Sequence, residues 1–122
     1  MEDIRHWLDD TNVGATLDDF RKIEMRVGRI VAVEEFPEAR NPSWKLLIDF
    51  GPHGTRRSSA AVRRWYERSA LLGRLVVCVT NFPTRRIATF ESEVLTLGAM
   101  QDDGRVVLLR PDADAALGSP IA

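Results

Sequence analysis

Residues 24–36 read EMRVGRIVAVEEF, a run in which apolar and polar side chains alternate on both sides of a glycine. Alternation with a period of two is typical of a strand that buries one face. The phase of the alternation slips near Gly28, which predicts a long strand bent at that glycine. A strand bent in this way curls a sheet toward a closed barrel.

Further segments predict the rest of the sheet. WKLLIDF (44–50), TRRSSAA (55–61) and LVVCVT (75–80) predict three strands, and SEVLTLGAM (92–100) and RVVLLRP (105–111) predict two more around the turn QDDG. Residues 60–72 place Val62, Trp65 and Tyr66 on one helical side, which predicts a helix with both aromatic side chains in the core. Thr16, with Asp19 three residues later, predicts a capped helix around 17–22.

The order of these elements predicts an all-β protein with short helices: an OB-fold five-stranded barrel plus an extra strand and an N-terminal helix. Residues 19–112 are expected to form this domain, preceded by an N-terminal extension (1–18) and followed by a C-terminal tail (113–122). Ile4, Trp7 and Leu8 have helical spacing in the extension. OB-fold ligands usually lie on strands 2 and 3 between two loops, here the predicted loops 37–43 and 81–91.

Composition narrows the class of protein. A chain of 122 residues is the size of one domain. No segment approaches the roughly 20 apolar residues that cross a bilayer, and the acidic start differs from a signal peptide. Cys78 is the single cysteine, so a disulfide framework is not expected. The sequence therefore predicts a cytoplasmic protein without membrane insertion.

The patterns of catalytic and metal sites are missing from the sequence. His6 and His53 are its two histidines, Cys78 lies in the middle of a predicted strand, and Ser58 and Ser59 lack a GxSxG elbow. No glycine-rich phosphate loop opens a helix. The prediction is a protein that is not an enzyme and needs no cofactor or metal.

The charge distribution favours a polyanionic partner. The formal net charge is -1, but residues 21–110 hold 16 basic and 10 acidic side chains between acidic ends. A basic body suits phosphate, although ordinary surface solvation or a bias toward arginine explains the same pattern. The basic side chains that could line one groove, and bind phosphate through arginine forks, are Lys45, Arg56, Arg57, Arg85, Arg86 and Arg40.

Neutral and aromatic side chains near the same loops leave alternatives open. Hydroxyl and amide groups can reach phosphate or a 2'-hydroxyl, or can be satisfied by the backbone; they belong to Ser58, Ser59, Asn81 and Ser92. Aromatic rings can stack on bases, receive an apolar peptide side chain, or close the barrel end; they belong to Phe36, Trp44, Phe82 and Phe90.

Several segments together resemble a known family. They are DFRKIEMRVGRI (19–30), EEFPEARNPSWKLLIDFG (34–51), SSA (58–60), NFPTRRIATFESEVLTLG (81–98) and VVLLRPD (106–112). In the same order they resemble CsaA-type proteins of the tRNA-binding-domain family, which includes the stand-alone tRNA-binding protein and C-terminal domains of some methionyl-tRNA synthetases. The resemblance implies an OB-fold homodimer that binds tRNA by shape with little sequence preference.

The resemblance also implies where ligands bind. The family's RNA-binding positions fall on Lys45, Ser58, Asn81, Arg85, Arg86 and Ser92. In the CsaA branch, a chaperone activity linked to export would hold unfolded or presecretory polypeptide near Phe36, Phe82 and Phe90. A third possibility is an assembly module that acts through its dimer surface, with residues 1–18 packed on the partner subunit. Thr89 occupies a place where the family usually has glycine, so a positive φ there would require a differently shaped loop.

Overall fold

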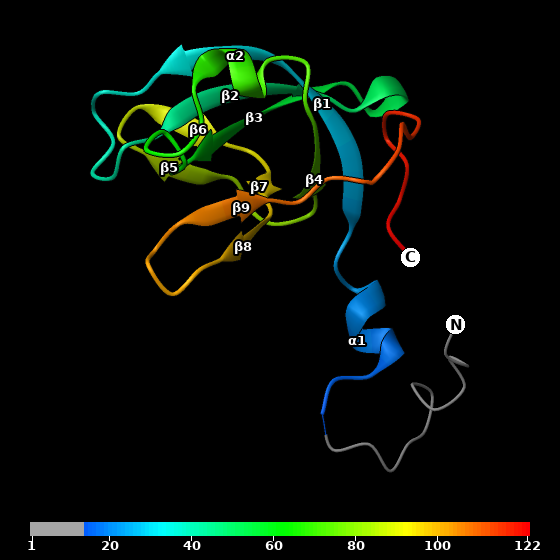
Figure 1. The fold of residues 1–122 in the computed structure, drawn as a ribbon. Helices are drawn as coiled ribbons and strands as arrows, with labels where there is room; N and C mark the ends of the chain where they lie inside the picture. The colour runs from blue at the N-terminus through cyan, green and yellow to red at the C-terminus, as the bar shows by residue number, and fades with distance from the viewer. Residues whose placement is uncertain (1–13) are drawn as a thin grey trace.

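The structure is a computed structural model of the chain and describes residues 14–122 (Figure 1). The expected helix around Ile4, Trp7 and Leu8 lies outside the described residues. In chain order the elements are α1 (Leu17–Arg21), β1 (Met25–Glu35), β2 (Trp44–Asp49), the 3-10 helix η2 (Gly51–His53), β3 (Thr55–Ala60), α2 (Arg68–Leu71), β4 (Leu75–Val79), β5 (Arg85–Ile87), β6 (Phe90–Ser92), β7 (Leu95–Thr96), β8 (Gly98–Met100) and β9 (Val106–Leu108).

The main sheet has five antiparallel strands in the order β3-β2-β1-β4-β7. Its two edges approach each other, because the backbone N–H of Glu93 donates to the carbonyl of Arg57 at 2.8 Å. The Ser58 hydroxyl reinforces this closure by donating to the carbonyl of Val94 at 3.1 Å. The sheet therefore forms a nearly closed barrel, which confirms the predicted OB-like class, and the β8–β9 hairpin is added to it (Figure 1).

Strand β1 is shared by both halves of the barrel. Its first part pairs with β4, from Met25 opposite Val79, and its last part pairs with β2, ending with Glu35 opposite Trp44. The pairing register shifts between Ile30 and Ala32, so the irregularity falls slightly after the predicted bend at Gly28. A strand that changes partner along its length needs such a bulge to turn from one pair to the next.

Gly28 has a packing role in β1. A Cβ atom at this position would lie 2.4 Å from Cγ2 of Ile48 and 2.8 Å from Cε1 of Phe50. Atoms of real side chains do not approach this closely. The glycine therefore lets β2 and its buried side chains lie directly against β1.

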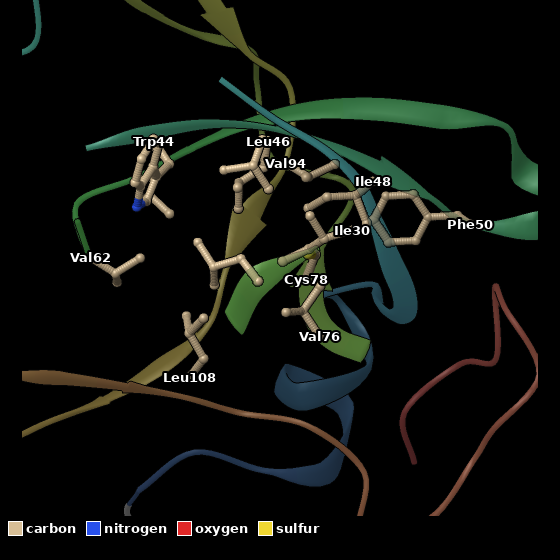
Figure 2. Packing of buried hydrophobic residues seen from close by; sticks show 13 residues of the cluster. Ile30, Trp44, Leu46, Ile48, Phe50, Val62, Val76, Cys78, Val94 and Leu108 are labelled. Carbon is tan, nitrogen blue, oxygen red and sulfur yellow. The ribbon is translucent and has the colours of Figure 1, made fainter. Parts of the chain in front are cut away.

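The core fills the barrel from β1, β2 and β4, with side chains from the β6–β7 region and β9 beside them (Figure 2). Its fully buried members are Phe50, Ile30, Leu46, Ile48, Leu71, Val76, Cys78 and Ser58. Trp44 is also buried, and its indole Nε1 donates to the carbonyl of Tyr66 at 2.9 Å. The expected strand 75–80 is confirmed as β4, which is buried on both faces at most positions.

The predicted helix over residues 60–72 is wrong for most of its length. Only Arg68–Leu71 is α-helical, and Glu67 before it has extended backbone angles. The amides of Trp65 and Tyr66 both donate to the carbonyl of Val62, which makes a turn there. Tyr66 packs against the core as expected, but Trp65 remains 38% exposed, so its predicted burial is wrong.

The predicted loop 81–91 contains a β-hairpin. Strands β5 and β6 pair from Arg85 opposite Ser92 to Ile87 opposite Phe90, which leaves a turn at residues 88 and 89. Within residues 14–122, Ala88 is the one non-glycine residue with a positive φ, 53°. The left-handed position of this turn is therefore Ala88, while Thr89 at the family's usual glycine place does not adopt it.

A capping box begins α1, and the C-terminal segment is hydrogen-bonded to β1. The capping box predicted at α1 is confirmed, since the Thr16 hydroxyl accepts from the Asp19 amide and the Asp19 carboxylate accepts from the Thr16 amide. Near the C-terminus, the amide of Gly118 donates to the carbonyl of Val27 at 2.8 Å, and the amide of Ile121 donates to that of Met25 at 3.0 Å. Within residues 14–122, no helix is long and apolar enough to cross a membrane.

Candidate functional site

Lys45 lies on the outer face of the barrel above two aromatic rings. Its Nζ is 4.9 Å from the ring centroid of Phe36 and 5.6 Å from that of Phe90. The two rings contact each other with centroids 5.4 Å apart and planes inclined by 60°. Cation–π attraction of this kind holds an ammonium group over the rings. Because Phe36 is only 3% exposed, its ring supports Lys45 from below.

Arg57 on β3 is held by acidic side chains from the β6–β7 region. Its Nε is 3.1 Å from Oε1 of Glu93, and its Nη2 is 3.6 Å from Oε2 of Glu91. Burial would raise the pKa of Glu93, but hydrogen bonds from the Arg57 backbone and guanidinium outweigh burial and hold that pKa below its ordinary value. Much of the positive charge of Arg57 is therefore offset within the protein.

Arg56 and Arg57 are neighbours in β3, so their side chains lie on opposite faces of the sheet. Neighbouring residues of a strand point to opposite faces. Arg56 lines a small pocket at one end of the barrel together with Glu24, His53 and Thr80. The expectation that Arg56 and Arg57 line a single groove is therefore wrong.

The hydroxyl groups of Ser58 and Ser92 hold the barrel closed. Ser58 is fully buried, and its Oγ lies 3.1 Å from the carbonyl of Val94 and 2.8 Å from Oγ1 of Thr96. Ser92 is 8% exposed, and its Oγ accepts from the amide of Ser59 at 3.0 Å. Of the alternatives open from the sequence, the structure favours hydroxyls satisfied within the protein.

Asn81 uses both ends of its side-chain amide within the protein. Its Oδ1 accepts from the backbone amide of Glu24 at 2.8 Å, and its Nδ2 donates to the carbonyl of Lys22 at 2.9 Å. These bonds fix the end of β4 to the segment between α1 and β1. The residue thereby sets where the chain enters the β5–β6 hairpin.

Arg85 and Arg86 present their side chains at the hairpin. Both are exposed, and within residues 14–122 neither forms an ion pair. The Nε of Arg86 donates to the carbonyl of Ala88 at 3.2 Å, which orients its guanidinium from within the same hairpin. In the part of the chain that the structure describes, these are the predicted arginines at the hairpin that form no ion pair, although Glu91 lies opposite Arg86 in the register and Glu93 lines the neighbouring cleft.

A cleft of about 640 Å³ lies beside these arginines. Ser59 of β3 lines one part of it, and the hairpin supplies Arg85, Arg86 and Ile87. Phe82 and Leu95, which are 45% and 47% exposed, add apolar surface. The cleft thus combines guanidinium groups with an apolar wall, and can accept an anionic group and an apolar group side by side.

Sequence reasoning missed two kinds of residue at this site. It did not find Ile87 in the cleft, because the hairpin was expected to be a loop, and it did not find Leu95 there, although Leu95 lay in the predicted strand 92–100. It also did not pair Arg57 with Glu91 and Glu93, although the alternation of Glu91, Ser92 and Glu93 is the pattern of a strand with two outward carboxylates.

Cys78 is buried and does not act as a reactive thiol. Burial raises the pKa of the Cys78 thiol to about 12, with the hydrogen bond to Thr96 acting in the opposite direction, so the thiol stays protonated. Within residues 14–122, no group of three histidine, cysteine or acidic side chains is placed to hold a metal ion.

Comparison with known proteins gives one family and two sets of relatives. The profile of the family described as "Putative tRNA binding domain" matches residues 25–120. Among curated proteins, the chain is 39% identical over 103 residues to methionine–tRNA ligase 1 of Sorangium cellulosum, a match covering 84% of this chain and 14% of the ligase. The methionine–tRNA ligase of Thermococcus kodakarensis is 35% identical over 107 residues, covering 87% of this chain and 14% of the ligase.

Solved structures give closer matches in length. The chaperone CsaA of Bacillus anthracis superposes with a TM-score of 0.85 at 42% identity, covering 90% of this chain and 100% of that chain. The CsaA chaperone protein of Picrophilus torridus superposes with a TM-score of 0.83 at 44% identity, covering 89% and 100%. The chain thus matches these structures over their whole length, but only a small part of each ligase.

Proposed function

We propose that this chain, which belongs to the tRNA-binding-domain family, binds tRNA along the outer face of β2 and β3 and the β5–β6 hairpin. The observation that carries the proposal is the pair of exposed arginines, Arg85 and Arg86, with no ion pair in the described chain. Arginine donates two parallel hydrogen bonds to a phosphate and gives up its hydration readily. The pair therefore supplies the main contacts to the RNA backbone.

Lys45 extends this surface onto the sheet. Its ammonium group is held over the rings of Phe36 and Phe90, so it loses little rotational freedom when it meets a phosphate. Such contacts read the position of phosphates and carry no base identity. Binding is accordingly expected to depend on the shape of the RNA and to tolerate changes of sequence. The proposed role is binding without catalysis, in the cytoplasm.

A second candidate ligand is unfolded polypeptide. The cleft beside the hairpin carries apolar surface from Phe82, Ile87 and Leu95 next to the arginines. The two solved structures matched at 42% and 44% identity are named as chaperones. An apolar wall with a charged margin suits an extended peptide that carries apolar and acidic side chains. In this version Phe82 is the main apolar contact.

A homodimer is the proposed assembly state. Phe20 of α1 and Ile23 after it are 36% and 39% exposed, where a second copy could cover them. Sedimentation velocity over a concentration series tests this directly: a single monomeric species would contradict it. A role as an assembly module would add a protein partner, which a pull-down would detect and which replacement of Phe20 should weaken.

The experiment that separates the two ligands is a mobility shift of total tRNA across a salt series, repeated with a permanently unfolded polypeptide such as reduced, alkylated lactalbumin. tRNA binding at low salt that falls steeply with salt supports the proposal. Absence of a shift at low salt overturns it. Competition between the polypeptide and tRNA would indicate that both ligands bind in the same cleft. In that case Phe82→Ala should reduce the competition. The control Met100→Ala, at an 83% exposed position elsewhere, should leave it unchanged.

A further inference from the structure

A second cleft, of about 650 Å³, lies where residues 73–75 and 110–114 meet β1, and it shares no lining residue with the cleft at the hairpin. In Figure 1 the β5–β6 hairpin lies at the left of the barrel, while the C-terminal segment lies at the right. Five charged side chains line this second cleft: Arg29, Arg74, Arg110, Asp112 and Asp114. The proposed function uses none of them.

These five charges are not satisfied by one another. Within residues 14–122, no ion pair joins any of the three arginines to either aspartate. Nε of Arg74 is buried and has no hydrogen-bond partner in this part of the chain. A buried donor without an acceptor carries a desolvation cost.

The backbone holds the arginines in fixed positions. The amide of Gly73 donates to the carbonyl of Ile30 at 2.8 Å, and the amide of Ile30 donates to the carbonyl of Arg74 at 3.0 Å. The Arg74 guanidinium lies 5.2 Å from the ring centroid of Tyr66, and Nη1 of Arg29 donates to the carbonyl of Gly73 at 2.8 Å. Two of the three arginines are therefore placed before any ligand arrives, which reduces the entropy lost on binding.

We propose that this cleft binds a ribonucleotide unit, with its phosphate on the arginines and a ribose hydroxyl on Asp112 or Asp114. Guanidinium groups match the paired oxygens of a phosphate, whereas ionised carboxylates accept hydrogen bonds only and therefore select a donor such as a hydroxyl. A ribonucleotide carries both groups close together, and the cleft lies within the range of about 300–1,000 Å³ typical of small-ligand sites. Half-buried Pro111 lines the cleft as well and offers apolar surface to a base.

The test is a titration of the isotope-labelled full chain with AMP, followed by the backbone amide signals of Gly73, Leu75 and Ala113. Saturable shifts of these signals are expected, with adenosine, which lacks the phosphate, binding at least about tenfold more weakly. Arg110→Ala, at an exposed position, should weaken AMP binding by a similar factor, while Arg105→Ala in the β8–β9 turn should not. Deoxyadenosine monophosphate should bind more weakly than AMP if a carboxylate accepts from the 2'-hydroxyl.

The proposal is overturned if AMP leaves these amides unchanged, if adenosine binds as well as AMP, or if Arg110→Ala has no effect on AMP binding. Sedimentation gives a further contradicting result: if the Arg110→Ala protein is a monomer where the unchanged protein is a dimer, the cleft is a contact between subunits. The tRNA affinity of the Arg110→Ala protein shows whether the ribonucleotide is part of an RNA chain or a free nucleotide. A loss with Arg110→Ala indicates an RNA chain in the cleft, and unchanged tRNA affinity with weakened AMP binding indicates a free nucleotide.

Discussion

Arg57 and Glu93 face each other across the closure of the barrel, with Nε and Oε1 3.1 Å apart, and Glu91 approaches the same guanidinium at 3.6 Å. This relationship divides the basic residues of the site into two groups. The charge of Arg57 is offset by the two carboxylates, whereas Arg85 and Arg86 are free of ion pairs in the described chain. Phosphate affinity should therefore depend on the hairpin more than on β3.

Removal of the Glu91 carboxylate should strengthen tRNA binding. Glu91→Gln leaves the shape of the side chain intact and frees part of the Arg57 charge, so tRNA affinity at low salt should rise by a few-fold. A mobility shift measures the change. Asp102→Asn, which removes an exposed carboxylate from the β8–β9 turn, is the matched control and should have a smaller effect. Equal effects of the two variants would mean that net charge alone, and not the Arg57 cluster, sets the affinity.

Glu93 should make the stability of the barrel depend on pH. Its pKa in the folded protein lies below the ordinary value of 4.5, so its contribution is complete above pH 4.5 and is lost as the pH falls through the lowered value. Thermal unfolding of the protein and of Glu93→Gln, measured from about pH 7 down to about pH 3, should show their largest difference in melting temperature at the upper end. A difference that grows on acidification would contradict the assigned ion pair.

Ser58 should be important for stability and unimportant for tRNA contact. Its buried hydroxyl bonds to Val94 and Thr96, so Ser58→Ala should lower the free energy of unfolding by about 1–3 kcal/mol. Chemical denaturation measures this loss, and Ser69→Ala at an exposed position of α2 should change stability by less than about 0.5 kcal/mol. A stable Ser58→Ala protein with weakened tRNA binding would instead place the hydroxyl on the ligand.

Gly28 should tolerate no side chain. In Gly28→Ala the new methyl group meets Ile48 and Phe50 at distances that demand movement of β2, so a loss of about 1–3 kcal/mol in unfolding free energy is expected. Val31→Ala, at a 42% exposed position of the same strand, is the control and should have a small effect. An unchanged denaturation midpoint for Gly28→Ala would mean that the two strands lie farther apart than described.

The strands of the barrel could be predicted from the sequence because each has its own apolar pattern. β1, β2 and β4 carry a buried face that is visible in consecutive residues, as in the burial of Trp44, Leu46 and Ile48 along β2. The hairpin of β5 and β6 could not be found in this way. Its strands have three residues each, and its turn places Ala88, a residue without turn preference, at positive φ.

Residues 60–72 show a helical spacing that tertiary contacts override. The carbonyl of Tyr66 accepts from the Trp44 indole, and its hydroxyl accepts from the amide of Leu108 at 3.0 Å. A turn at Val62 lets Tyr66 reach both partners, and α2 starts only after it. Such partners are distant in sequence, so local periodicity does not show them.

The same reason limits prediction of the site. Arg85 and Arg86 follow from residue type and from their place beside a strand end. The hydrogen bonds of Ser58 and Asn81 depend on the closed barrel. The partners of Ser58 lie 36 and 38 positions away in the sequence, and those of Asn81 lie 57 and 59 positions away. Residue type suggested both as ligand contacts, and only the three-dimensional arrangement shows what they already bind.

The salt dependence of tRNA binding by Arg85→Ala/Arg86→Ala tests the proposed site most directly. Each arginine that neutralises one phosphate contributes about one unit to the slope of log K against log salt, so the double variant should lose about two units. Arg21→Ala/Arg105→Ala, which removes two exposed arginines from α1 and the β8–β9 turn, is the control and should keep the slope of the unchanged protein. A double variant at the hairpin with an unaltered slope would contradict tRNA binding at this surface.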